Sequence, residues 1–201
     1  MRVDECIKCE TFHCIDVKHD CYIVPNIDVE AKQVYLIMIS EAAPFSPSDY
    51  YYAKGTPLFQ KTTVQAFKDA NVNVSSIQDI LEMGVYLTTA EKCGKIDYNI
   101  KSNTIKECSF LLEKELSLFL NLKVIMLMGD VAKKAINYIA KRSGEPRVIP
   151  AGSTYKIRNR EYFFQDKRVF PSYLQAGPSF FIEKSKRRMI AEDIIEAMKL
   201  L

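Results

Sequence analysis

The stretch KVIMLMGDVAKKAINYIAKR, from Lys123 to Arg142, joins a short apolar run to an amphipathic segment through a single glycine. An apolar run of this length is typical of a strand that is buried on both faces of a sheet. Gly129 provides the turn, and we expect Asp130 to cap the helix that follows. A buried strand followed at once by a helix is the repeating unit of parallel α/β sheets.

The same alternation of strands and helices extends along most of the chain. Apolar runs at Lys32–Ile39 and Gly84–Thr89 predict two more buried strands. Helical periodicity predicts helices over Gln60–Ala70, Ser75–Met83, Ser102–Leu120 and Ser179–Leu201. Thr104 and Glu107 have capping-box spacing, which predicts a helix start near Ser102 to Thr104. After Gly144 the runs RVIP, STYKI, EYFF and RVFPSY are short and β-like. The expected fold is a three-layer α/β/α sandwich around a central, mostly parallel four-stranded sheet.

Length and composition favour one soluble domain. The 201 residues are 48% hydrophobic and 26% charged, a balance typical of globular proteins. We therefore expect a single domain over residues 1–201, with residues 1–31 forming a cysteine-bearing N-terminal segment packed on its body. The N-terminus lacks an apolar targeting segment and no apolar run is long enough to span a bilayer, so we expect a cytoplasmic monomer without a membrane partner. The net charge of +3 neither demands nor excludes nucleic acid.

Three irregular segments are expected at one edge of this sheet. Parallel sheets place their sites in the loops that follow the carboxyl ends of the strands. The loops here are Ser40–Phe59, Thr88–Asn99 and Phe170–Phe180. The first loop carries two acids, Glu41 and Asp49, which are candidates for general-base chemistry. The three loops together predict a pocket.

The six cysteines admit several interpretations. Cys6, Cys9 and Cys93 lie in polar surroundings, which argues against their being ordinary buried thiols. Four cysteines close together near the N-terminus, with His13 nearby, are one possible zinc site: Cys6, Cys9, Cys14 and Cys21. The other interpretation is a metal centre whose thiols come from distant parts of the chain.

The order of motifs resembles the uracil-DNA glycosylase superfamily, in particular its iron-sulfur branch. The stretches that carry the resemblance are CIKC (Cys6–Cys9), SEAAP (Ser40–Pro44), GTPLF (Gly55–Phe59), VYLTTAEKC (Val85–Cys93), KEC (Lys106–Cys108) and FPSYLQ (Phe170–Gln175). The similarity in order and spacing covers nearly the whole chain. It implies a four-iron four-sulfur cluster held by Cys6, Cys9, Cys93 and Cys108. Structural zinc on the N-terminal cysteines stays the alternative cofactor.

The resemblance also implies roles for residues in the three loops. Glu41 falls at the position of the water-activating acid, and Asp49 is a candidate replacement. The implied base-binding positions are Ala42, Leu58, Phe59 and Thr89. Two positions depart from the family pattern, because Thr89 replaces an asparagine and Leu174 replaces a histidine. The departures weaken the assignment of uracil as the substrate.

DNA is the partner that the resemblance implies. The implied contacts are Ser172, Leu174, Gln175, Gly177, Ser179, Lys186 and Arg187. The expected function is hydrolysis of the N-glycosidic bond of uracil or another deaminated or damaged base in DNA. The alternative is a catalytically silent, cluster-containing module of the same fold that binds nucleic acid or a nucleotide.

Overall fold

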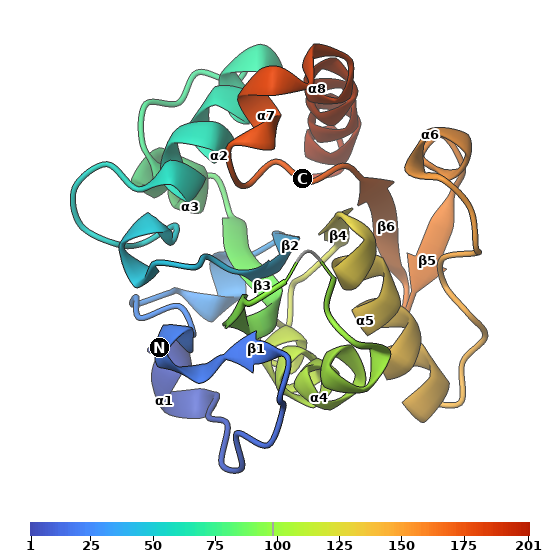
Figure 1. The fold of residues 1–201 in the computed structure, drawn as a ribbon. Coiled ribbons are helices and arrows are strands. Elements are labelled where there is room, and N and C mark those ends of the chain that lie inside the picture. The colour runs from blue at the N-terminus through green and yellow to red at the C-terminus, as the bar shows by residue number, and fades with distance from the viewer. Residues whose placement is uncertain (98) are drawn as a thin grey trace.

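The computed structural model describes residues 1–97 and 99–201, which form one mixed β-sheet with helices on both faces (Figure 1). The described residues contain six strands: β1 (Val17–Lys18), β2 (Leu36–Ala43), β3 (Val85–Lys95), β4 (Val124–Met128), β5 (Tyr162–Phe164) and β6 (Lys167–Ser172). Their order in the sheet is β1-β3-β2-β4-β6-β5. The four central strands are parallel, whereas β1 and β5 pair antiparallel at the two edges. The α/β class is confirmed, but the sheet is larger than the four strands expected.

The helices divide between the two faces of the sheet. One face is covered by α2 (Leu58–Asp69), α3 (Ile77–Glu82), α7 (Ser179–Ile182) and α8 (Lys184–Met198). The other is covered by α4 (Ser102–Ser117) and α5 (Asp130–Arg142) (Figure 1), and the short helices α1 (Val3–Cys6) and α6 (Thr154–Ile157) add Val3 and Ile157 to the same apolar core. In the described part of the chain, no helix has both the length and the apolar character needed to cross a bilayer.

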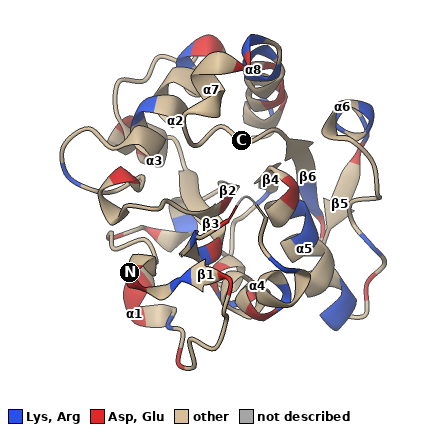
Figure 2. Ribbon diagram, viewed as in Figure 1, with Lys and Arg blue, Asp and Glu red and all other residues tan. Residues whose placement is uncertain are grey.

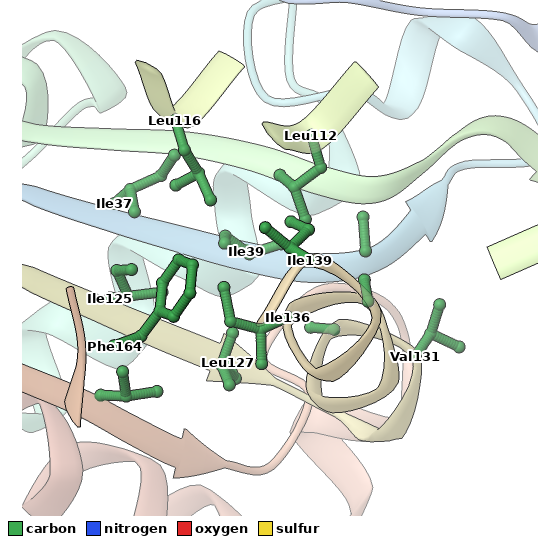
Figure 3. Close-up of a cluster of buried hydrophobic side chains, with 14 of the residues drawn as sticks. Ile37, Ile39, Leu112, Leu116, Ile125, Leu127, Val131, Ile136, Ile139 and Phe164 are labelled. Atoms are coloured by element: carbon green, nitrogen blue, oxygen red, sulfur yellow. The ribbon is translucent and has the colours of Figure 1, made fainter. Parts of the chain in front are cut away.

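Side chains of the central strands alternate between two apolar cores. Ile37 and Ile39 of β2 pack with α4 and α5, whereas Leu36 and Met38 pack with α2, α3 and α8. Figure 3 shows part of the first core, where Ile136 of α5 and neighbouring apolar side chains lie against the sheet. A strand buried on both faces needs apolar residues at every position. This requirement explains why β2 and β4 appear in the sequence as continuous apolar runs.

Two local expectations are wrong, and side-chain hydrogen bonds explain both. Thr104 does not form a capping box at the start of α4, because its hydroxyl donates to Asp16, which also accepts the Lys101 N–H at 2.6 Å. The run RVIP forms no strand, because the Asn137 side chain bonds both the N–H and the carbonyl of Ile149, each at 2.9 Å.

The later segments differ in part from expectation. STYKI contains the helical turn α6 rather than a strand, whereas EYFF and RVFPSY contain β5 and β6 as expected. The expected C-terminal helix is divided into α7 and α8 at Glu183, whose φ of −90° and ψ of 72° are not helical.

A buried ion pair joins β3 to α4. The Lys92 ammonium lies 2.5 Å from Glu115, and both side chains are fully buried. Lys92 also donates to the Thr88 hydroxyl at 2.8 Å and to the Thr89 carbonyl at 2.6 Å, so three acceptors match its three N–H groups. Glu115 accepts further hydrogen bonds from Tyr86 and Thr88. The complete pairing offsets the large cost of removing both charges from water.

Substitution of Lys92 by Met should lower the free energy of unfolding by about 3–5 kcal/mol, because it leaves the Glu115 carboxylate buried without its counterion. Urea denaturation measures this loss. The double variant Lys92→Met, Glu115→Leu should regain part of the stability. As a control, Lys199→Met breaks an exposed pair with Glu196 and should cost about 0–1 kcal/mol. A Lys92→Met variant as stable as the original protein would contradict the role given to this pair.

Candidate metal centre and the carboxyl edge of the sheet

Four thiols from distant parts of the chain line one cavity. The cavity has a volume of about 220 Å³, and its lining includes Cys9, Cys14, Cys93 and Cys108. Cys93 lies near the end of β3 and Cys108 lies on α4, so these two belong to the body of the domain. Cys9 and Cys14 come from the N-terminal segment that covers them. We call this space the thiol cavity.

Three of the four cysteines implied as cluster ligands therefore line the thiol cavity, and the fourth does not. Cys6 ends the short helix α1, is exposed, and its thiol lies 3.5 Å from the Arg2 carbonyl. Cys14 lines the cavity instead. Cys21 is buried outside the lining, where its thiol donates to the Phe45 carbonyl at 2.9 Å. The local zinc set is divided in the same way, because only Cys9 and Cys14 of its four thiols line the cavity.

Burial favours the neutral form of three of these thiols, those of Cys14, Cys93 and Cys108. Burial, together with the negative charge of Glu91, raises the pKa of Cys93 to about 12. Burial also raises the pKa of Cys108 well above its ordinary value, and it raises the pKa of Cys14. The Cys93 sulfur lies 3.5 Å from Nδ1 of His19. Metal ions bind thiolates, so a metal in this cavity would displace protons from these groups.

Glu91 is a cavity residue that the sequence analysis missed. Its side chain is only 2% exposed, and one carboxylate oxygen accepts the Cys93 N–H at 3.3 Å. The other oxygen, Oε2, is buried and has no hydrogen-bond partner among the described residues. Burial raises the pKa of this carboxyl group to about 7. The signal in the sequence that could have identified Glu91 is its position two residues before Cys93, a candidate metal ligand.

The donor chemistry of the thiol cavity fits a metal centre. Four thiols, two histidines and an unpartnered carboxylate oxygen line or border one small space. Within residues 1–97 and 99–201, no three Cys, His, Asp or Glu side chains are arranged to hold a metal ion as they stand. Binding would therefore require the thiols to move closer together. Soft thiolate ligands favour iron-sulfur clusters or zinc over magnesium or calcium.

Glu41 lies at the carboxyl edge of β2, as expected, and is fixed by two partners. Its Oε1 accepts the Asp130 N–H at the start of α5 at 2.9 Å, and its Oε2 pairs with Lys95 at 2.5 Å. Gly129 precedes Asp130 with a φ of 104°, and a Cβ there would lie 2.6 Å from Glu41. Asp130 is thus the first residue of α5, and Glu41 caps the helix in its place.

The second candidate acid, Asp49, has a structural role. It ends a 3₁₀ turn, Pro47–Asp49, and its carboxylate accepts the Leu58 N–H at the start of α2 at 3.2 Å. This contact satisfies one of the free amides of the first helical turn. Asp49 therefore caps α2.

The implied base-binding residues are largely buried. Phe59 packs against Tyr51 with ring centroids 5.3 Å apart, and Ala42 is also buried, whereas Leu58 is half-buried. Thr89 pairs with Ser40 across the sheet, and its hydroxyl is buried without a partner among the described residues. Because Thr89 is fully buried, a ligand could reach this hydroxyl only if the packing around it opened.

Several residues of the third loop, Phe170–Phe180, which we call the late loop, are held against the body of the domain. Gln175 is buried and bonds Ser40 and Tyr51, and Ser172 donates to Asp193 at 2.5 Å. Leu174 is half-buried. These side chains hold the loop to the body of the domain.

The expected basic contacts are paired with acids. Arg187 forms an ion pair with Asp69 of α2, and Lys186 lies 2.5 Å from Glu183. Figure 2 shows acidic and basic residues interspersed over α8. Gly177 has a φ of 111° before α7, and Ser179 at the start of α7 is exposed. Of this set, Ser179 is the most available to a ligand.

Neither protein-family models nor curated proteins give a match to this chain. Its function therefore has to follow from its own residues and their geometry.

The thiols of the metal-free protein should differ sharply in reactivity. At pH 8, iodoacetamide should modify exposed Cys6 at least about 100-fold faster than Cys93 or Cys108, because the reactive species is the thiolate and their raised pKa values suppress it. Mass spectrometry of proteolytic fragments measures each rate. In urea the rates should converge. Equal rates for Cys6 and Cys93 in the folded protein would contradict this account of the cavity.

Proposed function

We propose that this chain is a DNA repair glycosylase-like protein that carries an iron-sulfur cluster in the thiol cavity. The observation that supports the proposal most strongly is the convergence of Cys9, Cys14, Cys93 and Cys108 on one small space. A four-iron four-sulfur cluster requires four thiolates. The motif order that resembles the iron-sulfur branch of the uracil-DNA glycosylase superfamily connects this centre to DNA.

In this proposal Cys14 takes the position that the motif order gave to Cys6. The four ligands then join three parts of the domain, namely the N-terminal segment, the end of β3 and α4. The cluster supplies a covalent crosslink among them, and it leaves the carboxyl edge to perform the chemistry. Glu91 would remain beside the cluster as a buried acid.

Protein purified without oxygen should be brown and contain about four irons per chain. Cys14→Ser should abolish the colour and lower the iron content, whereas Cys6→Ser should leave both nearly unchanged, because Cys6 lies outside the cavity lining. Metal analysis and visible absorption measure the two effects. Colourless protein with one zinc per chain would support the zinc alternative. Loss of iron in Cys6→Ser but not in Cys14→Ser would restore the ligand set taken from the motifs.

Glu41 is the residue proposed to carry the hydrolysis. Its carboxylate would accept a proton from water as the water oxygen bonds to C1′ of the sugar. The bond between C1′ and the base nitrogen breaks as the new bond to oxygen forms, and its electron pair leaves with the base, which takes up a proton afterwards. Asp130 and Lys95 already fix the orientation of this carboxylate, as a general base requires.

A second candidate function is a catalytically silent module of the same kind that binds nucleic acid or a nucleotide. Two observations favour it. Glu41 and Asp49 both cap helices, which explains their presence without catalysis. Leu174 cannot stabilise a departing anion as an imidazolium would.

Excision of uracil, hypoxanthine and xanthine from oligonucleotides, followed as abasic sites, separates the two candidates. Glu41→Gln should reduce excision by about 10²- to 10⁴-fold, the usual loss for a general base, while DNA binding stays nearly constant. Leu174→His should raise activity on uracil by restoring a group that stabilises the base anion. Glu82→Gln is the control. This acid ends α3 just before β3 begins, so it lies at the amino edge of the sheet, opposite the carboxyl edge that holds Glu41.

The silent module is favoured if the unsubstituted protein excises none of the three bases and the Leu174→His variant also excises none.

A further inference from the structure

A basic groove runs along α5, and its lining shares no residue with the thiol cavity or with the late loop. Two adjoining cavities, of about 380 and 230 Å³, share Lys134, Asn137 and Arg147 in their linings. One wall is α5, and the other is the segment from residue 145 to residue 152 (Figure 1). We call the combined space the α5 groove.

The groove presents cations that no acid neutralises. Lys134 and Lys141 are exposed and seven residues apart on α5, so they lie on the same side of the helix about 10 Å apart. Neither ammonium has an ion pair or hydrogen bond to any residue of the described chain. Arg147 uses its Nε to bond the Ile149 carbonyl at 2.7 Å, which fixes the guanidinium at the rim.

The acids of the groove do not cancel this charge. Asp130 is paired with Lys133 at 2.6 Å, and the same ammonium donates to Thr154 at 2.6 Å, so both charges are satisfied within the protein. Glu145 is the other acid in the lining. Three cations therefore face one acid in the groove, and Figure 2 shows basic residues on α5 and on the segment beside it.

The groove begins at the carboxyl edge of the sheet. Asp130 lines the smaller of the two cavities, and the N–H of the same residue binds Glu41. Tyr138 lines the larger cavity, so an aromatic ring lies between the two exposed lysines along the helix. Cations that follow a backbone, with an aromatic ring among them, are the features by which proteins bind single strands.

We propose that the α5 groove binds single-stranded nucleic acid, with its phosphates on Lys134, Lys141 and Arg147 and a base against Tyr138. The positive charge favours a nucleic acid as the ligand, because phosphates are negative. The aromatic ring favours a single strand over a duplex, because the bases of a duplex are stacked inside it and cannot stack on Tyr138. A strand that passes the carboxyl edge would continue along this groove. The inference requires neither base excision nor a metal.

The test uses the full chain and a fluorescent thymidine 12-mer, which contains no damaged base, with binding followed by anisotropy. Lys134→Gln with Lys141→Gln should weaken binding at least about 10-fold at low salt, and should reduce the slope of log Kd against log salt concentration by about 1.4. The matched control is Lys61→Gln with Lys68→Gln, two exposed lysines with the same spacing on α2. The control should bind within about 2-fold of the original protein.

Tyr138→Leu separates the two forms of nucleic acid. It should weaken binding of the single strand by about 10-fold without a change in the salt slope, because it removes stacking and no charge. A duplex of the same length should bind more weakly and should not respond to this substitution. Equal binding of the duplex, with no effect of Tyr138→Leu, would overturn the single-strand assignment. If the α5 pair behaves like the α2 control, the groove itself is not the site.

Discussion

The buried pair of Lys92 and Glu115 is the constraint on which the rest of the candidate metal centre depends. Lys92 immediately precedes Cys93, and Glu115 follows Cys108 by seven residues, or two turns of α4. A charge pair without access to water must keep its geometry, because any separation leaves two uncompensated charges in the interior. The ion pair therefore fixes the end of β3 against α4, and with it the relative positions of two of the four thiols.

The other two thiols depend on a segment with less regular structure. The N-terminal segment is tied to the body by polar contacts, such as Asp16 with Lys101 and the Ile23 N–H with the Lys92 carbonyl at 2.8 Å. Tyr22 accepts the Cys9 N–H at 3.0 Å, which holds Cys9 at the rim of the cavity. Contacts of this kind each stabilise a fold by about 1 kcal/mol. A metal that joins the segment to β3 and α4 would therefore contribute much of its attachment.

The sequence predicts the buried centre of the fold better than its edges. Strands β2, β3 and β4 each begin with a continuous apolar run because both of their faces are covered, and that pattern is visible without a structure. Strand β1 has two residues and β5 has three, too few for any periodicity, so their pairing with β3 and β6 could not be foreseen. The starts of α4 and α5 at Ser102 and Asp130 agree with the sequence prediction, but the groups that cap these helices do not. The caps of α4 and α5 come from Asp16 and Glu41, which are remote in sequence from the helices that they cap.

The same limit applies to the candidate sites. The structure places Cys9, Cys93 and Cys108 of the motif set around one cavity, but the motif pattern selected Cys6 because of its spacing from Cys9. The short helix α1 ends at Cys6, which lies exposed near the Arg2 carbonyl and outside the thiol cavity. For Glu41, the position at the edge followed from the end of β2. Its partners Lys95 and Asp130 lie 54 and 89 residues further along the chain, and only the fold brings them together.

The last residues of β3 connect the two candidate sites. Cys93 lines the thiol cavity, and two residues later Lys95 pairs with Glu41 while its backbone pairs with Val17 of β1. A ligand that holds Cys93 in place also restrains Lys95, because a strand paired with neighbours on both sides moves as a unit. A ligand bound in the thiol cavity would therefore restrain the orientation of the Glu41 carboxylate through three consecutive residues of one strand, Cys93 to Lys95.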